Sequence, residues 1–330
     1  MNLRSPNSLR FAPVGGGYAS ATAPPQIRAP TLQRFQLSDS SNSPNSMTLQ
    51  RCIAILATLL MVLAFGCDRD GSPADDGTYI QSDDWPEDVE RIVSLAPNTT
   101  ELLFELGLGD RVVATTRYCD WPEQAQQLPN VGGMLDPDFE AILDAEPDVV
   151  VGTTDGADHR VQERFDGAGI DYGFVTMDDF ASVRAGIRTF GEWFDRQSEA
   201  RELINDFDRR LDDVRHQPIR QHRTALMVLD TDPYIAAGPG SLGDEMLTYA
   251  GFDNAVGDDA GDYPMLDAEQ LLALNPQVVI ITDLNTERTP AAIDNLGAEQ
   301  VVHLDDPVVL RPGPRIPQAV ELLAEQHDSP

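Results

Sequence analysis

The sequence contains no lysine, and cysteine is scarce. All 23 basic residues are Arg, whereas Asp and Glu number 55, and the formal net charge is -32. A chain this acidic repels phosphate, which argues against a nucleic-acid partner. The three cysteines, Cys52, Cys67 and Cys119, are too few and too scattered for a disulfide framework or a four-cysteine zinc site. We expect Cys119 to be a small, half-buried residue.

Motifs of metal sites and of hydrolases are also missing. The five histidines have no metal-site spacing, and His159 with His303 is the only pair that could be considered for a metal. The chain has no G-x-S-x-G, no Cys and His pairing and no H-E-x-x-H. We therefore expect neither a resident metal or cofactor nor catalytic residues.

A targeting segment precedes the folded part. The apolar run that follows Arg51 and ends at Gly66 is shorter than the ~20 residues of a membrane-spanning helix, but it suits a signal peptide over residues 47–66. Leu63–Cys67 resembles a lipoprotein signal-peptidase site, which predicts a periplasmic protein anchored by a lipid on Cys67. The alternatives are an ordinary secretory signal or an uncleaved anchor.

The segments on either side of the signal peptide should not pack. Residues 1–46 are rich in Pro, Ser, Asn and Gly and lack apolar periodicity, so they are disordered or belong to an over-called start. Met47 would be a more conventional first residue than Met1. Acids, Gly and Pro over residues 67–88 predict a flexible tether.

An internal repeat predicts two lobes. Residues 138–151 and 267–280 share Asp, Glu, Leu, Pro and two Val at a constant offset. Each copy reads as an Asp-capped helix, a Pro stop and a strand of consecutive β-branched residues. Continuous apolar strands that follow helices indicate parallel sheets covered on both faces.

The predicted fold class is therefore α/β, with two Rossmann-like lobes bridged by one long α-helix. Residues 89–177 form the N-terminal lobe and residues 219–330 the C-terminal lobe. Between them, apolar residues at spacings of three and four predict a bridging helix over residues 178–218, of roughly 35 residues or as two collinear helices. A cleft between two lobes is a preferred place for a small-molecule site.

Four stretches resemble a known family as a block: Ile92–Ala114, Tyr118–Pro122, Val131–Gly133 and Glu146–Val151. They are similar to the helical-backbone, or class III, periplasmic binding proteins for vitamin B12 and iron-siderophore complexes. The resemblance implies a ligand held in the groove between the lobes. It also implies an ABC permease dimer in the inner membrane as partner, with the binding protein itself a monomer.

Two acids of the repeat match surface glutamates of that family. Glu140 and Glu269 correspond to residues that dock one per lobe onto arginines of the permease dimer. Two like charges at symmetric places suit a two-fold partner and can steer the encounter. Alternatively, each carboxylate only complements the positive end of its own helix.

The resemblance also supplies candidate ligand-binding residues. Tyr118 and Tyr263 match aromatic positions that flank the corrin ring in B12 binders, and Trp121 and Tyr234 lie close by in sequence. Core packing or loop anchoring is the alternative role of any of these rings. Two more candidates, Met134 and Thr153, stand where B12 binders can present tryptophans. Arg311 or Arg315 could meet an anionic ligand group, or could only stiffen their loop.

Three functions remain open at this stage. We expect the protein to capture a bulky metal chelate without making or breaking a bond. Cobalamin or another corrinoid is the first candidate ligand, and a ferric siderophore or haem is the second. The third, a nicotinamide- or flavin-linked oxidoreductase, depends on Gly238–Gly243, which spells G-x-G-x-x-G.

Asn98–Glu101 has the form of a capping box, which predicts that a helix starts there.

Overall fold

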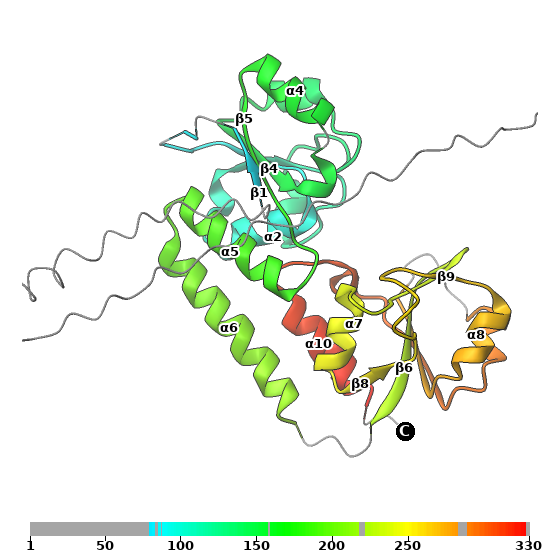
Figure 1. The fold of residues 1–330 in the computed structure, drawn as a ribbon. Helices are drawn as coiled ribbons and strands as arrows, with labels where there is room; N and C mark the ends of the chain where they lie inside the picture. The colour runs from blue at the N-terminus through cyan, green and yellow to red at the C-terminus, as the bar shows by residue number, and fades with distance from the viewer. Residues whose placement is uncertain are drawn as a thin grey trace, which may run out of the picture. The chain divides into compact units, whose positions relative to one another are not determined.

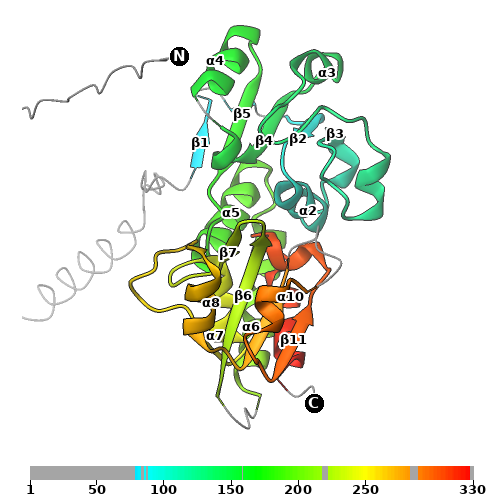
Figure 2. The same ribbon diagram turned by 90° about the vertical axis from the view of Figure 1, so that its right-hand side faces the viewer.

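The computed structural model describes residues 79–82, 85–86, 88–157, 159–217, 222–282 and 289–327, which belong to one compact unit. The predicted signal peptide, Cys67 and most of the tether lie outside these residues. In the part of the chain that is described, every helix is too short or too polar to cross a bilayer. The described elements build two separate sheets (Figures 1 and 2).

The first lobe contains a five-stranded sheet of order β1-β5-β4-β2-β3, in which only β1 is antiparallel to its neighbour. Its strands are β1 (Tyr79–Gln81), β2 (Ile92–Ser94), β3 (Val112–Thr115), β4 (Val149–Thr153) and β5 (Asp171–Val175). Its helices are α2 (Pro97–Glu105), α3 (Phe139–Asp144) and α4 (His159–Ala168), with the short turns η1 (Gly109–Arg111), η2 (Glu123–Gln127) and η3 (Thr154–Gly156). The central strand β4 is buried throughout, as expected for a sheet covered on both faces.

The second lobe contains a six-stranded sheet of order β11-β10-β6-β7-β9, with β8 also paired to β6. Its strands are β6 (Arg223–Thr231), β7 (Tyr234–Ala236), β8 (Phe252–Asn254), β9 (Met265–Leu266), β10 (Val278–Ile281) and β11 (Gln300–His303). Its helices are α7 (Leu242–Tyr249), α8 (Ala268–Leu274), α9 (Ala291–Asp294) and α10 (Ile316–Glu325), with the turn η4 (Pro307–Leu310). Unlike the first sheet, this one ends in two antiparallel pairings, β6 with β7 and β7 with β9.

The repeat forms the same unit in each lobe. Asp138 caps α3 by accepting backbone N–H bonds of 3.1 and 3.2 Å, and Asp267 caps α8 in the same way at 2.9 and 2.8 Å. After each helix the residue before the proline, Glu146 or Asn275, adopts a positive φ near 46°, and a buried strand follows. The left-handed residue ends the helix before proline would have to continue it.

The segment between the lobes contains two helices that lie side by side, α5 (Phe180–Trp193) and α6 (Gln197–Arg215) (Figure 1). The chain reverses between them, where Asp195 has φ 54°. Arg184 Nε therefore lies 2.5 Å from Asp208 Oδ1, and the Phe180 and Phe207 rings meet edge to face. The predicted two-lobed α/β fold is confirmed. The prediction that residues 178–218 form one helix, or two collinear helices, is wrong, because α5 and α6 lie side by side. The apolar spacing of three and four continues through both helices, so the reversal is hidden from it.

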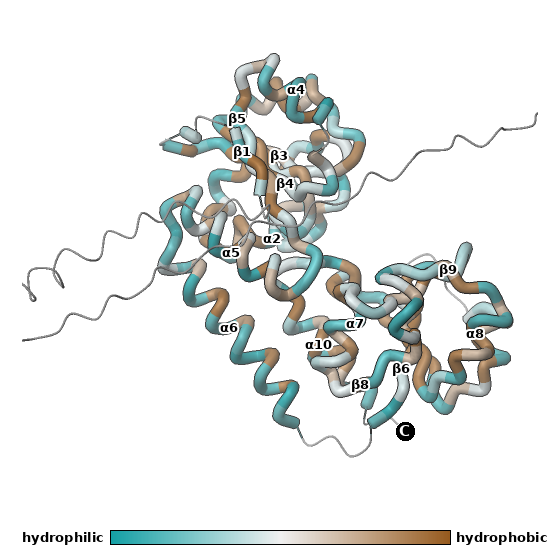
Figure 3. Tube along the Cα trace, viewed as in Figure 1, coloured by the Kyte–Doolittle hydropathy of each residue, from teal (hydrophilic) through white to brown (hydrophobic). Residues whose placement is uncertain are grey.

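Both helices span the lobes. The Phe180 N–H donates to Glu245 of α7 in the second lobe at 2.9 Å, while Trp193 at the other end of α5 packs on Gly173 of β5 in the first. α6 returns, and Arg210 binds Glu321 of α10 at 2.7 Å. Brown apolar segments recur along the otherwise teal α6 in Figure 3. They belong to the largest apolar cluster, which runs without a break from the α2 side of the first sheet to α7 and α10 of the second. This shared core resists hinge motion.

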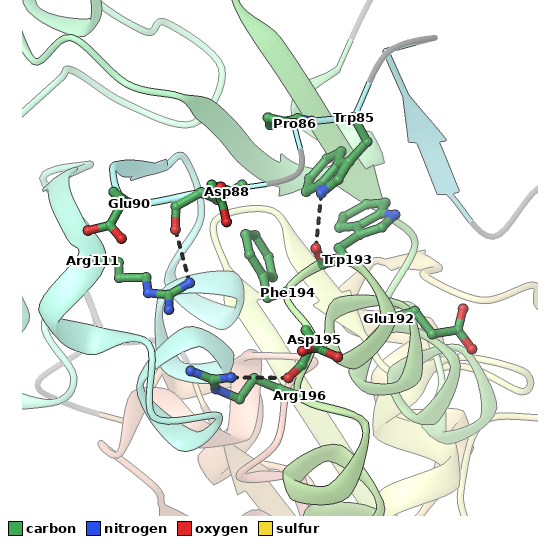
Figure 4. A pocket seen from close by; sticks show the side chains of 11 residues that line it. Trp85, Pro86, Asp88, Glu90, Arg111, Glu192, Trp193, Phe194, Asp195 and Arg196 are labelled. Atoms are coloured by element: carbon green, nitrogen blue, oxygen red, sulfur yellow. Dashed lines mark hydrogen bonds between the residues drawn. The ribbon is translucent and has the colours of Figure 1, made fainter.

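Residues 79–82 and 85–86 of the predicted tether are part of the fold, so its limit at residue 88 is too late. β1 pairs with β5, and the Trp85 indole stacks on Trp193 at 4.8 Å. Trp85 Nε1 also donates to the Trp193 carbonyl at 3.0 Å. A pocket of about 430 Å³ lies between the segment from Trp85 to Glu90 and the turn from α5 to α6. The side chains of Arg111 and Arg196 project into this pocket (Figure 4).

Candidate ligand-binding groove

A cleft forms where the strands of the first lobe end. After β2 the chain adds β3 on one side of β2, and then crosses over to add β4 on the other side. The edge where these strands end is therefore a topological switch point. Ligands of open α/β sheets bind outside the carboxyl ends of strands at such a point. Pro97 and Asn98 follow β2, Asp155 follows β4 and Met177 follows β5.

A cavity of about 290 Å³ occupies this place and is shared by the two lobes. The first lobe contributes Pro97, Asn98, Met134, Thr153 and Asp155, and Met177 comes from the link to α5. The remaining wall is Leu310–Pro312, a loop of the second lobe. Five of the nine lining residues are apolar, and Asn98, Thr153, Asp155 and Arg311 supply polar groups, a mixture that suits a small-molecule site. The larger pocket at Trp85 lies at the opposite end of α5 and borders only first-lobe and helix residues.

The second-lobe loop is fastened to the first lobe by ion pairs. Arg315 binds Glu101 of α2 through two bonds, Nε–Oε2 at 3.0 Å and Nη2–Oε1 at 2.6 Å. Glu101 is only 2% exposed, so these bonds compensate its burial. Asn98 Nδ2 also donates to the Pro312 carbonyl at 2.8 Å.

Arg311 makes the second interlobe connection. Its Nη2 lies 3.0 Å from Asp120 Oδ2, and its Nη1 lies 3.5 Å from Glu101 Oε1. The hydrogen bond from Arg311 holds the pKa of Asp120 below its usual value. Both guanidinium groups are paired with carboxylates in this structure, and the anion-binding role considered for Arg311 and Arg315 stays a prediction. Both are committed to first-lobe carboxylates, which the sequence places more than 190 residues away.

Aromatic rings are exposed on both lobes beside this cavity. Tyr118 is 52% exposed and Trp121 47%, and both lie in the first-lobe segment that carries Asp120. Arg117 stacks over Tyr118 with its guanidinium carbon 5.0 Å from the ring centre, and Arg315 stacks over Trp121 at 4.7 Å. On the second lobe Tyr263 is 55% exposed. The rings are therefore held in place while their outer faces stay open.

Three carboxylates influence the hydroxyl of Tyr263. Burial, with the charges of Asp178, Asp262 and Asp155, raises the pKa of the Tyr263 hydroxyl. Burial and the charge of Asp155 likewise raise the pKa of Asp178. Asp155 belongs to the first lobe, so this mutual influence shows that both lobes face the same acidic region.

Three of the eight predicted ligand residues belong to the wall of this cavity. Met134, Thr153 and Arg311 line the cavity, and Thr153 Oγ1 lies 3.8 Å from the Met134 sulfur. Tyr234 does not join them. It stands on β7, partly buried, and packs against the apolar cluster of the second sheet, outside the cavity wall.

The sequence missed the residues that hold the groove together. Asn98 and Glu101 have the spacing of a capping box, but α2 begins at Pro97 with Ala96 as its uncapped N-cap, and both side chains reach across to the second lobe instead. From the sequence, one could expect only that Arg311 and Arg315 each pair with some Asp or Glu. Because the chain has 55 of these acids, that expectation does not identify Glu101 or Asp120 as the partner.

Glu140 and Glu269 occupy the same place in the two lobes. Each lies in the first turn of its helix, α3 or α8, and each is exposed. Within the described residues, neither carboxylate forms an ion pair. Such a pair of free acids is compatible with docking and with stabilisation of the helix ends alike.

The glycine motif of the second lobe has a packing role. It follows β7, which is antiparallel to β6, whereas a dinucleotide motif follows a parallel strand. A Cβ on Gly238 would meet the Gly261 carbonyl at 2.0 Å, and one on Gly243 would meet Ala237 at 2.5 Å. Ser241 between them caps α7 by accepting from the Asp244 N–H at 3.2 Å. Close backbone approach explains the glycines without a cofactor.

The two histidines considered for a metal are separated. His159 begins α4 in the first lobe, and His303 ends β11 in the second, where its Nε2 lies 2.9 Å from Thr289 Oγ1. The described part of the chain holds no group of three His, Cys, Asp or Glu side chains placed to bind a metal ion.

Cys119 is only 4% exposed, and its sulfur lies 3.1 Å from Thr100 Oγ1. It is therefore more deeply buried than the half-buried position expected from the sequence.

Comparison with known proteins identifies relatives of this fold and groove. A sequence profile described as periplasmic binding protein matches residues 92–303. A vitamin B12-binding protein of Yersinia pestis (strain Pestoides F) is 26% identical over 246 residues, which cover 72% of this chain and 86% of that protein.

Solved structures agree. The periplasmic vitamin B12 binding protein BtuF of Vibrio cholerae is 27% identical, with a TM-score of 0.61 over 72% of this chain and 96% of that one. The apo periplasmic heme-binding protein RhuT of Roseiflexus sp. RS-1 is 25% identical, with a TM-score of 0.63 over 73% and 98%. Because the matching profile spans more than half of the chain and both copies of the repeat, this chain belongs to the periplasmic binding protein family.

Proposed function

We propose that the protein captures a bulky metal chelate, cobalamin or another corrinoid, and delivers it to the permease of an ABC importer. The observation that carries this proposal is the set of exposed rings, Tyr118 and Trp121 on one lobe and Tyr263 on the other, beside an interlobe cavity at a switch point. Flat rings on both sides suit a large planar ligand. Relatives named for B12 binding, at 26% and 27% identity, support the choice of a corrinoid.

Haem is the second candidate. It is supported by the heme-binding relative at 25% identity with a TM-score of 0.63. Calorimetric titration of the purified protein with cyanocobalamin, haem and a ferric siderophore separates these candidates. We expect cyanocobalamin to bind most tightly, and the corrinoid proposal fails if haem does. A fluorescence titration with a nicotinamide dinucleotide should show no binding, since we infer that no bond is made or broken.

Capture should change the shape of the protein little. The two spanning helices share a continuous apolar core with both lobes, and the ion pairs of Glu101 close one side of the groove. We expect the radius of gyration from small-angle scattering to differ by less than about 1 Å between free and cobalamin-saturated protein. A larger decrease on ligand addition would contradict this expectation and would show that the lobes close.

The permease should be recognised by Glu140 and Glu269 together. Replacing both with Lys is expected to reduce uptake of the captured ligand at least about tenfold, because like charges then face the arginines of the partner. Ligand affinity in solution should not change, since both residues lie on the surface. The measurement is uptake of labelled cobalamin by cells that depend on this protein.

A matched control reverses two other exposed acids, Glu202 on α6 and Asp294 on α9. This variant has the same net charge as the Glu140→Lys, Glu269→Lys protein and should transport normally. Equal loss of uptake in both variants would show that total charge matters and not the repeat-related positions, and unchanged uptake in both would remove the docking proposal.

We further propose that the protein is monomeric and held at the membrane by a lipid on Cys67. The signal-like run before Cys67 supports this anchor. Mass spectrometry of the protein from the envelope fraction should find Cys67 as the acylated N-terminus. Any other mature N-terminus excludes the anchor.

A further inference from the structure

The arginines beside the groove are already paired. Arg117 lies 2.7 Å from Asp136, Arg311 binds Asp120, and Arg315 binds Glu101. Each guanidinium is thus neutralised by a carboxylate of the first lobe. Two of them also stack on the aromatic rings, Arg117 on Tyr118 and Arg315 on Trp121, which fixes them further. Among the described residues, a ligand that enters here finds no unpaired arginine on the first-lobe side.

Three carboxylates of the groove have no such compensation. Asp155 lines the cavity, Asp178 follows Met177 of the same cavity, and Asp262 precedes Tyr263. None of the three forms an ion pair with an arginine of the described residues. All three act on the same side chain: burial first, and then the charges of these carboxylates, raise the pKa of Tyr263. Among the described residues, the site therefore carries an excess of negative charge, contributed by both lobes and by the link between them.

The size of this effect is enough to discriminate ligands. Two unit charges about 8 Å apart, at an effective dielectric constant of about 20, change a binding constant roughly thirtyfold. Salt reduces the effect at an open groove, where the Debye length is about 8 Å at physiological ionic strength. We take about tenfold per ligand carboxylate as the expected discrimination.

We infer that this groove selects its ligand by charge, accepting neutral or cationic metal chelates and rejecting polyanionic ones. This inference rests on the proposed function and narrows it. A corrinoid carries its peripheral polar groups as uncharged amides, whereas haem carries two propionates and a ferric tris-catecholate has three negative charges. The uncompensated carboxylates of the groove repel a polyanionic ligand. A ring that bears uncharged amides can contact the same polar groups without this charge repulsion.

The test compares two ligands of the same shape and different charge. Cyanocobalamin and its monocarboxylic acid derivative, in which one side-chain amide is hydrolysed, differ by one negative charge. At low salt we expect the acid to bind about tenfold more weakly, and we expect the ratio to shrink towards one as salt increases. Isothermal titration at several salt concentrations measures both quantities.

Two variants locate the cause. In Asp155→Asn, Asp178→Asn the ratio between the two ligands should fall to about twofold. The control Asp166→Asn, Asp212→Asn removes two exposed acids far from the cavity and should keep the wild-type ratio. An equal ratio in wild type and groove variant, or equal affinities of the two ligands at low salt, would overturn the inference.

Failure of the corrinoid proposal would look different. If cyanocobalamin does not bind at all, charge selection is decided with ferric chelates, a trihydroxamate that bears a free ammonium group against a tris-catecholate. Preference for the cationic trihydroxamate supports the inference while the ligand assignment changes. Tighter binding of the tris-catecholate, or of haem over every neutral chelate, overturns it.

Discussion

Replacement of Tyr118 or Tyr263 by alanine is expected to weaken cobalamin binding about thirtyfold, and replacement of both at least about a hundredfold. Each ring is about half exposed in the free protein, so a planar ligand that covers it removes roughly 80–100 Å² of apolar surface from water, which contributes about 2 kcal/mol. The rings stand on different lobes, so their losses should nearly add. Titration calorimetry on the three variants measures the dissociation constants.

Two controls accompany this prediction. Tyr118→Phe keeps the ring and should bind within about threefold of wild type, because its contribution is mainly contact area. Tyr79→Ala removes a tyrosine of β1, far from the groove, and should leave affinity unchanged. If loss of both groove tyrosines changes affinity by less than about threefold, the ligand does not lie on these rings and the proposed site is wrong.

Replacement of Glu101 by alanine is expected to destabilise the protein by about 3–5 kcal/mol. Glu101 is 2% exposed and receives Arg315 through two bonds and Arg311 at 3.5 Å, so its removal leaves two cations, each less than a fifth exposed, without their buried partner. For a domain of this size the unfolding midpoint should fall by roughly 10 °C. Thermal and urea unfolding followed by circular dichroism measure the change.

The same helix provides the control. Glu105→Ala, one turn further along α2, removes an exposed acid whose pKa is raised by burial and by the charge of Glu101, so its loss should be neutral or slightly stabilising. Glu101→Gln keeps the shape and the acceptor oxygen and should cost less than alanine. Equal midpoints for Glu101→Ala and Glu105→Ala would show that the interlobe pairs do not fasten the loop.

Local patterns determined the secondary structure of the repeat. The Asp-capped helices α3 and α8 and the buried strands β4 and β10 follow from caps, proline stops and runs of Val and Ile, all of which act within about ten residues. The same periodicity could not show that α5 and α6 fold back on each other. A reversal at Asp195 leaves the spacing of apolar residues intact on both sides.

Among the site residues, the aromatics were within reach of the sequence, and their surroundings were not. Tyr118 and Tyr263 came from similarity to family positions and Trp121 from its nearness to Tyr118 in sequence, and the structure leaves all three exposed. Tyr234 shared their chemistry and nearness in sequence, yet β7 turns it towards the apolar cluster of the second sheet. Side-chain direction depends on strand pairing, which the sequence does not display.

By itself, then, the sequence determined two α/β lobes, the repeat and the family, because these depend on local periodicity and on motifs that are contiguous in the chain. Only the tertiary structure decided that Arg311 and Arg315 hold the lobes together and that Asp155, Asp178 and Asp262 form no ion pair with a described arginine. Ion pairs join residues that are distant along the chain, and with 55 acids for 23 arginines no sequence pattern specifies which acid each arginine finds. The excess charge left in the groove is a consequence of that choice.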